Sequence, residues 1–343
     1  MRAARFLAAL VLALGLAPVT PARAEVLDFE NLAGWAEDDH LAALKIFLTS
    51  CDLIEGEDWA PLCRLARDAA VSDEAARDFF ELFFKPVVIG APPALFTGYF
   101  EPVLDGSPVR TPRFAWPIYR RPPELLDGQV WYDRATIERG ILRGRGLELA
   151  WLEDPVDVYF LQVQGSGRIR MPDGHVIRVG YGGRNGHAYA SVGTAMVAQG
   201  IATSDQVDAG SIQDYVRANP GTGAELMNLN PSYVFFRKIA DLPADQGPIG
   251  AMGRPITPLR SVAVDPAYVP LGVPVWVEKA GAEPMQRLMV AQDTGGAIKG
   301  AQRADIFFGT GREAGRAAGR IKDGGRMVVL LPIDRAFLVA SGG

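Results

Sequence analysis

Apolar residues recur at helical spacing in residues 36–88. They form two groups, each along one side of a helix: Leu41, Leu44, Phe47 and Leu48, and then Ala75, Phe79, Leu82 and Phe83. Ser72 stands just before the second group and has the side chain of a helix N-cap. Pro86, Pro92 and Pro93 then interrupt the pattern. We therefore expect helices that end near Pro86.

After these prolines the period of the pattern falls to two, which is typical of strands. Phe96–Pro102 is a short aromatic strand that a proline ends, and Tyr159–Gln164 and Arg168–Met171 alternate between apolar and polar residues. His175–Val179 alternates again, behind the turn-forming sequence Pro172–Gly174. The last two alternating segments therefore predict a β-hairpin.

Helical and strand patterns then follow one another. Ala188–Ala198 and Ser211–Ala218 predict helices, the second with Ser211 as its cap, and Arg312–Ile321 predicts another. Beyond Asn230 the apolar segments are short and lie between glycines, prolines or charges: Val234–Phe236, Ser261–Val264, Pro274–Val277, Leu288–Val290, Asp305–Phe308 and Met327–Leu331. Many short, closely spaced strands predict a small β-barrel. A chain of 343 residues is long enough for two domains.

The N-terminus has the pattern of an export signal. Arg2 and Arg5 precede the apolar run Phe6–Ala17, and Ala22–Ala24 forms a small-residue cleavage site, so the mature chain is expected to begin at Glu25. The run is short for a membrane span. An uncleaved N-terminal anchor remains the alternative.

Composition and charge narrow the class of protein. Hydrophobic residues make up 48% of the chain, enough for a sizeable core. The formal charge is −5, and loss of the three arginines of the predicted signal would bring it to about −8. Because no basic block with interleaved aromatic residues occurs, nucleic acid is not the expected partner.

Cysteines and histidines are few. Cys51 and Cys63 predict a disulfide in an exported protein, which would stabilise the fold by about 2–3 kcal/mol, with two buried thiols as the alternative. His40, His175 and His187 lack the spacing of metal ligands, so neither a metal nor a cofactor is expected.

Three aspartates of the C-terminal strands could carry chemistry. Asp293-Thr-Gly295 matches the short motif of aspartic proteases, but a chain of this length needs two copies and has one. Asp305 begins the apolar segment Ile306–Phe308, where a carboxyl group would be hard to ionise and would suit a general acid for glycosidic bonds. Asp265 ends another strand. A solvated turn is the alternative for each aspartate.

Several segments, in order, make the chain similar to the family of membrane-bound lytic transglycosylase A, which cleaves peptidoglycan. They are Phe96–Pro102, Gln164–Gly167, Tyr181–Tyr189, Asn230–Phe236, Val264–Gly272, Gln292–Gly300 and Arg303–Phe307. The last three resemble the family's three-aspartate domain, a double-psi β-barrel. The resemblance extends from about Leu95 to Leu331 and does not clearly cover residues 25–90.

The resemblance implies a mainly β fold with helices (α+β), in which a second β-rich domain is inserted into the barrel-bearing one with a groove between them. We expect a signal peptide at 1–24, a barrel-bearing domain with N-terminal helices at 25–103 and 231–343, and the inserted domain at 104–230. The chain lacks the cysteine of a lipid-modified N-terminus, so periplasmic location is expected and membrane anchoring stays open.

The implied activity is that of a peptidoglycan lytic exotransglycosylase. Such an enzyme cleaves the β-1,4 bond between N-acetylmuramic acid and N-acetylglucosamine and forms a 1,6-anhydro ring. The C6 hydroxyl of the substrate is the nucleophile, so one carboxyl group can serve as acid and then as base. The family's catalytic aspartate corresponds to Asp305, and Asp293 lines the same groove.

The remaining expected site residues are substrate contacts. They are Tyr99, for stacking on a sugar, and Gln164, Ser166, Asn185, Lys299 and Asp265, with His187 expected to be structural rather than a ligand. The protein is expected to be a monomer, and its expected partner is the glycan strand of peptidoglycan. Association with the outer membrane or the cell-wall machinery stays open. Two alternatives remain: hydrolysis with water, with Asp293 as base, and a wall-binding module without activity.

Overall fold

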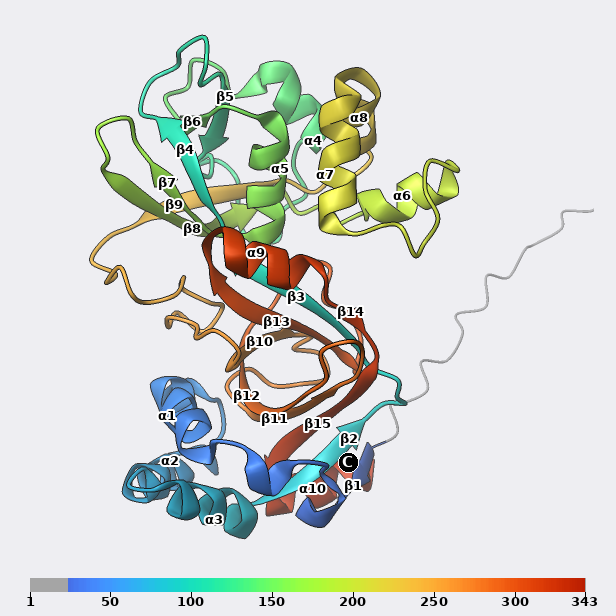
Figure 1. Cartoon of the computed structure of the whole chain (residues 1–343). Coiled ribbons are helices and arrows are strands. Elements are labelled where there is room, and N and C mark those ends of the chain that lie inside the picture. Colours follow the sequence, from blue (N-terminus) through green and yellow to red (C-terminus); the bar gives the residue numbers. More distant parts are fainter. Residues whose placement is uncertain (1–23, 343) are drawn as a thin grey trace, which may run out of the picture.

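The computed structural model describes residues 24–342 and contains two sheets flanked by helices (Figure 1). The predicted signal peptide therefore lies, apart from Ala24, outside the described residues. The combination of sheets and helices confirms the expected α+β class. Among the described residues, no helix has both the length and the apolar character needed to cross a membrane.

The larger sheet has nine strands and forms, with its helices, what we call the nine-stranded lobe. Its strand order is β1 (Ala24–Val26), β2 (Phe84–Ile89), β15 (Gly325–Pro332), β11 (Pro274–Lys279), β12 (Met285–Asp293), β10 (Ser261–Val264), β13 (Arg303–Thr310), β3 (Leu95–Glu101) and β14 (Lys322–Asp323). The strands curve around one apolar core (Figure 1). The six strands expected beyond Asn230 are all confirmed, although β9 (Val234–Ile239) belongs to the other sheet.

Helices cover two sides of the nine-stranded lobe. Below it in Figure 1 lie α1 (His40–Ser50), α2 (Trp59–Ala69), α3 (Asp73–Phe83) and α10 (Ile333–Ala340), and on its other side α9 (Gly311–Gly319) packs against β3 and β13. Short 3-10 turns occupy Phe29–Asn31, Trp35–Glu37 and Cys51–Leu53. An added Cβ at Gly98 would lie 2.7 Å from Ala318 Cα, so a glycine in β3 allows α9 to approach closely.

The N-terminal helices largely follow the apolar pattern. Ser72 caps α3 by accepting a hydrogen bond from the amide of Ala75, as expected. The predicted helical region is wrong at its end, because Phe84–Ile89 forms strand β2 with Pro86 inside it. A disulfide links Cys51 to Cys63, which joins the end of α1 to α2.

The smaller sheet has six strands and forms the six-stranded lobe. Its order is β5 (Trp116–Tyr119), β6 (Glu148–Leu152), β4 (Val103–Ser107), β7 (Gly167–Arg170), β8 (Val176–Arg184) and β9. The predicted hairpin is confirmed as β7 and β8. Helices α4 (Arg134–Thr136), α5 (Pro155–Gln164), α6 (Val192–Ala198), α7 (Ala209–Ala218) and α8 (Pro220–Asn228) and the wide turn Ile137–Ile141 complete it. Helix α5 lies between the sheet and α6–α8 (Figure 1).

Two local predictions in this lobe are wrong. Tyr159–Gln164 belongs to helix α5, because Asp154 accepts a hydrogen bond from the amide of Val156 and Pro155 fixes the first helical turn. Helix α7 is capped by Asp208 rather than by Ser211, whose side chain bonds back to the amide of Asp208 and completes a capping box.

The expected domain boundary at residue 230 also differs from the sheet topology. It assigned Val234–Phe236 to the barrel-bearing domain, whereas β9 pairs along its length with β8 in the six-stranded sheet. An apolar strand carries no signal for which of two sheets it joins. We therefore propose that the inserted domain extends from β4 through β9.

A buried ionic cluster joins the two lobes. Glu101, at the end of β3 and 1% exposed, accepts hydrogen bonds from Arg168 on β7 (2.8 Å), Arg178 on β8 (2.9 Å) and Thr310 on β13 (2.8 Å). The two arginines also donate to backbone carbonyls of residues 243–246, in the segment that returns from β9 to β10. This cluster therefore fixes the position of one lobe against the other.

Candidate active site

Strand register brings Asp293 and Asp305 to the same face of the nine-stranded sheet. Ala263 on β10 is paired with Asp293 on β12 and with Asp305 on β13, so the two aspartates flank one small residue. An irregularity between Val262 and Ala263 shifts the register and turns Asp293 to this face. Two strand spacings separate backbones by about 10 Å. The sheet thus places two carboxyl groups across a gap that a larger residue at 263 would fill.

Asp305 is held through one of its two oxygens. Thr97, its partner on β3, donates to Asp305 Oδ1 at 2.5 Å, and Arg303 Nη2 donates to Thr97 Oγ1 at 2.8 Å. Among the described residues, Asp305 Oδ2 has no hydrogen-bond partner. Burial raises the pKa of Asp305 above its ordinary value, while the Thr97 hydroxyl and the charge of Arg303 act in the opposite direction. A carboxyl group in this position can keep its proton and present it to a ligand.

Asp293 is held through both oxygens. The amides of Ala251 (3.1 Å) and Thr294 (2.9 Å) donate to Oδ1, and the Tyr99 hydroxyl donates to Oδ2 at 3.0 Å. Burial raises the pKa of Asp293 to about 6, the nearby charge of Asp305 also raises it, and the three donors oppose both effects. Asp293 is thus an oriented carboxyl group that titrates close to neutral pH.

The structure gives Tyr99 a different role from sugar stacking. Its side chain is 8% exposed and packs with Phe307 at a ring-centroid distance of 5.3 Å. Burial beside Asp293 raises the pKa of Tyr99 well above its usual range, so its hydroxyl stays protonated and donates. Because the side chain is largely buried and its hydroxyl donates to Asp293, we propose that Tyr99 orients Asp293 rather than stacks on a sugar.

Asp265 and Lys299 organise the glycine-rich loop that follows Asp293. Asp265 Oδ2 accepts from the amide of Gly300 (2.9 Å), its Oδ1 accepts from the amide of Ala267 (3.3 Å), and Lys299 Nζ lies 3.5 Å from Oδ1. Burial opposes ionisation of Asp265, but these amides and the ammonium group hold its pKa below the ordinary value. We therefore propose that Asp265 is an ionised anchor for the loop rather than the expected substrate contact. Lys299 is exposed.

Of the expected contacts in the six-stranded lobe, Asn185 is also structural. It is 0% exposed, its amide donates to the carbonyls of Tyr132 and Pro231, and its oxygen accepts from the amide of Tyr233. These bonds use both of its N–H donors and its oxygen, so we propose a structural role for Asn185 in place of the expected substrate contact. His187 bonds the carbonyl of Trp131 at 2.8 Å, in agreement with the structural role expected for it.

Gln164 and Ser166 lie where the lobes meet, but at the end of a helix. Gln164 is the last residue of α5, and its Oε1 accepts from the amide of Phe100 on β3 at 3.0 Å. Gly165 adopts φ 77°, which ends the helix and returns the chain into β7. Ser166 is 8% exposed. Gln164 therefore joins α5 of the six-stranded lobe to β3, the strand that carries Thr97.

The glycine-rich loop after Asp293 also touches the six-stranded lobe. An added Cβ at Gly296 would lie 3.6 Å from Tyr189 Cβ and 3.9 Å from Arg184 Nη1. Arg184 is the last residue of β8 and Tyr189 follows this strand, so both belong to the six-stranded lobe. The loop after Asp293 thus forms one side of the junction between the lobes, with Arg184 directly across from it.

The sequence reasoning missed three residues that define this site. Thr97 and Arg303 form the chain of hydrogen bonds to Asp305, and Arg184 faces the glycine-rich loop after Asp293. Arg303 stands two positions before Asp305 in a strand, so alternation places both on one face, and this signal could have been used. Thr97 carries no local signal, because it meets Asp305 only through strand pairing.

Two models of known protein families match successive parts of the chain. The family model of the MltA specific insert domain matches residues 95–237, and the model of the 3D domain matches residues 260–331. Two curated relatives are called membrane-bound lytic murein transglycosylase A. The one from Vibrio cholerae is 35% identical over 68% of this chain and 64% of its own length. The one from Escherichia coli K12 is 36% identical over 72% and 68%. The chain thus spans about two thirds of the length of these relatives.

Solved structures are similar over more of the chain. A membrane-bound lytic murein transglycosylase from Agrobacterium tumefaciens aligns with a TM-score of 0.81 at 31% identity, covering 92% of this chain and 99% of that one. The Escherichia coli MltA structure with bound chitohexaose aligns with a TM-score of 0.72 at 28% identity, covering 91% and 95%.

Proposed function

Because the chain belongs to the membrane-bound lytic murein transglycosylase A family, we propose that it cleaves the β-1,4 bond between N-acetylmuramic acid and N-acetylglucosamine in peptidoglycan and leaves 1,6-anhydromuramic ends. One observation carries the proposal: Asp305 is half-buried, has a raised pKa, and keeps one oxygen unoccupied among the described residues. That combination is what a single acid–base residue needs.

Hydrogen-bond directions support a proton on Oδ2 of Asp305. Arg303 can only donate, so the Thr97 hydroxyl accepts from it and directs its own hydrogen to Asp305 Oδ1. Oδ1 is therefore an acceptor, and the acidic proton sits on Oδ2. Oδ2 is the oxygen that a substrate can reach.

The reaction needs no water. Asp305 gives its proton from Oδ2 to the bridging oxygen, and the bond between that oxygen and C1 of the muramic residue breaks. The C6 hydroxyl of the same residue then forms a bond to C1 and returns its proton to Asp305. Because the nucleophile is part of the substrate, its effective concentration is high and no second catalytic carboxylate is required.

Asp293 supports this reaction from across Ala263. With a pKa of about 6, much of it is ionised at neutral pH. Its charge opposes ionisation of Asp305 and stabilises the positive charge that develops at C1. Hydrolysis with Asp293 as base is less favoured, since the two amides and the Tyr99 hydroxyl stabilise its ionised form and so make it a weaker base.

Digestion of purified cell-wall sacculi tests the proposed bond and product. The protein should release soluble fragments whose muramic ends resist borohydride reduction, because an anhydro ring has no reducing group. Reducible ends would indicate hydrolysis. Sedimentation with the sacculi without released fragments would indicate a wall-binding module. Either result would overturn the proposal.

Replacing Asp293 by asparagine should lower kcat about 10- to 100-fold and move the alkaline limb of the pH–rate profile to lower pH. The charge of Asp305 raises the pKa of Asp293, and this repulsion is reciprocal, so removal of the Asp293 charge should let Asp305 lose its proton more easily. Initial rates on solubilised glycan strands across pH measure both effects. An alkaline limb that stays in place would contradict the coupling between the two carboxyl groups.

Replacing Thr97 by valine should move the same limb in the opposite direction. The Thr97 hydroxyl stabilises the ionised form of Asp305, so its loss raises the pKa of Asp305 further. Turnover should fall about 10-fold because the carboxyl group is less well oriented. Thr97→Ser keeps the hydroxyl and is the matched control, with a profile expected to coincide with that of the wild type.

We place the mature protein in the periplasm, where its substrate lies. The export pattern of residues 1–24 supports this location. The relatives are called membrane-bound, and a comparison of soluble and membrane fractions of cells would show whether this chain is anchored as well.

A further inference from the structure

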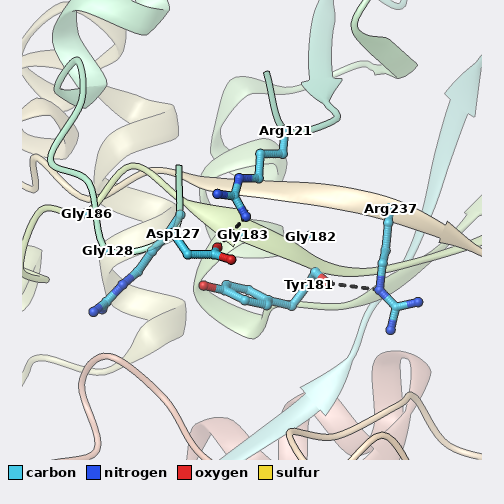
Figure 2. A pocket seen from close by; sticks show the side chains of 9 residues that line it. Arg121, Asp127, Gly128, Tyr181, Gly182, Gly183, Gly186 and Arg237 are labelled. Carbon is cyan, nitrogen blue, oxygen red and sulfur yellow. Dashed lines mark hydrogen bonds and ion pairs between the residues drawn. The ribbon is translucent and has the colours of Figure 1, made fainter. Parts of the chain in front are cut away.

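We propose that a pocket lined by arginines in the six-stranded lobe binds carboxylate groups of the peptide stem that substituted muramic residues carry. This inference rests on the proposed function, because it assumes peptidoglycan as the ligand. The pocket has a volume of about 380 Å³ and is lined by Arg121, Asp127, Tyr181, Arg184, Arg237 and the glycines between them (Figure 2).

The pocket carries two guanidinium groups without an acidic partner. Arg121 forms an ion pair with Asp127 and also donates to the carbonyl of Leu125, so its charge is balanced. Arg237 uses only its Nε, which donates to the carbonyl of Tyr181 (Figure 2). Arg184 forms no hydrogen bond or ion pair within residues 24–342 that involves its side chain. A protein with a formal charge of −5 thus holds a local excess of positive charge here.

The backbone keeps the floor of the pocket bare. Gly183 adopts φ 131°, and an added Cβ there would lie 2.8 Å from Arg121 Cδ. Gly186 adopts φ 82°, and an added Cβ would lie 2.2 Å from the carbonyl oxygen of Gln129. Side chains at these positions would displace the walls of the pocket. The open floor leaves the planar guanidinium forks, which suit bidentate binding of carboxylates, accessible to a ligand.

Arg184 connects this pocket to the glycine-rich loop after Asp293. Its Nη1 lies 3.9 Å from the position of a Cβ on Gly296, three residues beyond Asp293. A ligand carboxylate bound by Arg184 would therefore lie close to the glycine-rich loop that follows Asp293. An extended peptide spans about 3.3–3.6 Å per residue, so three stem residues extend about 10 Å from the sugar. A stem of that length suits a pocket whose Arg184 lies beside the loop after Asp293.

Neutral sugars carry no negative charge that arginines without an acidic partner could bind, whereas peptide stems do. Each stem carries free carboxyl groups, while the lactyl group of a substituted muramic residue is already an amide. The pocket would thus distinguish strands that carry peptides from bare glycan. Because both arginines are exposed, the gain should be modest for each and sensitive to salt.

Binding to an inactive protein tests this inference without catalysis. In the Asp305→Asn background, affinity is measured for stem-bearing glycan strands and for the same strands after their stem carboxyl groups have been converted to amides. Amidation should weaken binding about 20-fold. Arg184→Gln and Arg237→Gln should each weaken binding of the untreated strands about fivefold. The double variant should bind both kinds of strand equally weakly.

Control variants separate this result from general damage. Arg64→Gln changes an exposed arginine in α2, far along the chain from the pocket, and should preserve the 20-fold preference. Arg184→Lys and Arg237→Lys should each keep part of the preference that the glutamine variants lose, since they keep the charge without the planar fork. Equal losses on untreated and amidated strands, or no effect of amidation on the parent protein, would overturn the proposal.

The proposed function fails in a different experiment. A digest without anhydro ends would refute the lytic reaction, but a preference for carboxylated stems in this binding assay would still stand. Conversely, anhydro ends combined with indifference to amidation would refute only the stem pocket.

Discussion

Replacement of Asp305 by asparagine should lower turnover on glycan strands about 1,000-fold or more while the protein still folds and binds them. The amide cannot give a proton to the bridging oxygen or take one from the C6 hydroxyl, so both halves of the reaction lose their acid–base group. Single-turnover assays and co-sedimentation with sacculi measure the two properties separately. Asp334→Asn, at an exposed position in α10, is the control and should retain activity.

Stability gives a second check on the same variant. Burial raises the pKa of Asp305, so the folded state disfavours its ionised form. Its contribution to stability is therefore present at low pH and is lost as pH rises through the raised pKa. At pH 7 the neutral amide should give a melting temperature at least as high as that of the wild type.

Near-wild-type turnover in this variant would show that Asp305 is not the acid.

Replacement of Glu101 by glutamine should lower the free energy of unfolding by about 3–5 kcal/mol. Glu101 is 1% exposed and is the acidic partner of both Arg168 and Arg178, so the variant leaves two largely buried positive charges uncompensated. Urea unfolding monitored by tryptophan fluorescence measures the change. Glu225→Gln on the surface of α8 is the matched control and should differ little from the wild type.

This cluster also links stability to the active site. Glu101 ends the strand that carries Thr97, and its arginines hold the segment that leads back to the nine-stranded lobe. The Glu101→Gln variant should therefore lose catalytic efficiency through a higher KM, because the two lobes are no longer held in place. An unchanged urea midpoint would show that the three groups are not energetically coupled.

Much of the fold follows from local patterns. The strands of the nine-stranded sheet beyond Asn230 and the hairpin of β7 and β8 alternate clearly and are bounded by turn residues. The alternation in Tyr159–Gln164 predicts a strand wrongly, because a helix that packs on both sides can show the same pattern. Asp154 and Pro155, which begin the helix, decide the structure. The sheet that β9 joins is set by tertiary contacts with β8, which no local pattern encodes.

The candidate site could be predicted only in part. The resemblance of short motifs identified Asp293 and Asp305, whose juxtaposition then follows from the register with Ala263. Their partners were not predictable, because Thr97 is 208 positions away from Asp305 in sequence. Tyr99 and Asn185 were assigned to the substrate since polar and aromatic residues in glycine-rich segments suit ligands equally well. Burial decides between the two roles, and it is visible only in the folded chain.

Digestion of sacculi in ¹⁸O-labelled water tests most directly whether one carboxyl group carries the whole reaction without a water nucleophile. We predict muramic ends that carry no ¹⁸O label and have the mass of the anhydro form. Ends that are heavier by one labelled water would contradict this account, since they would require hydrolysis at C1 and a second group to activate the water.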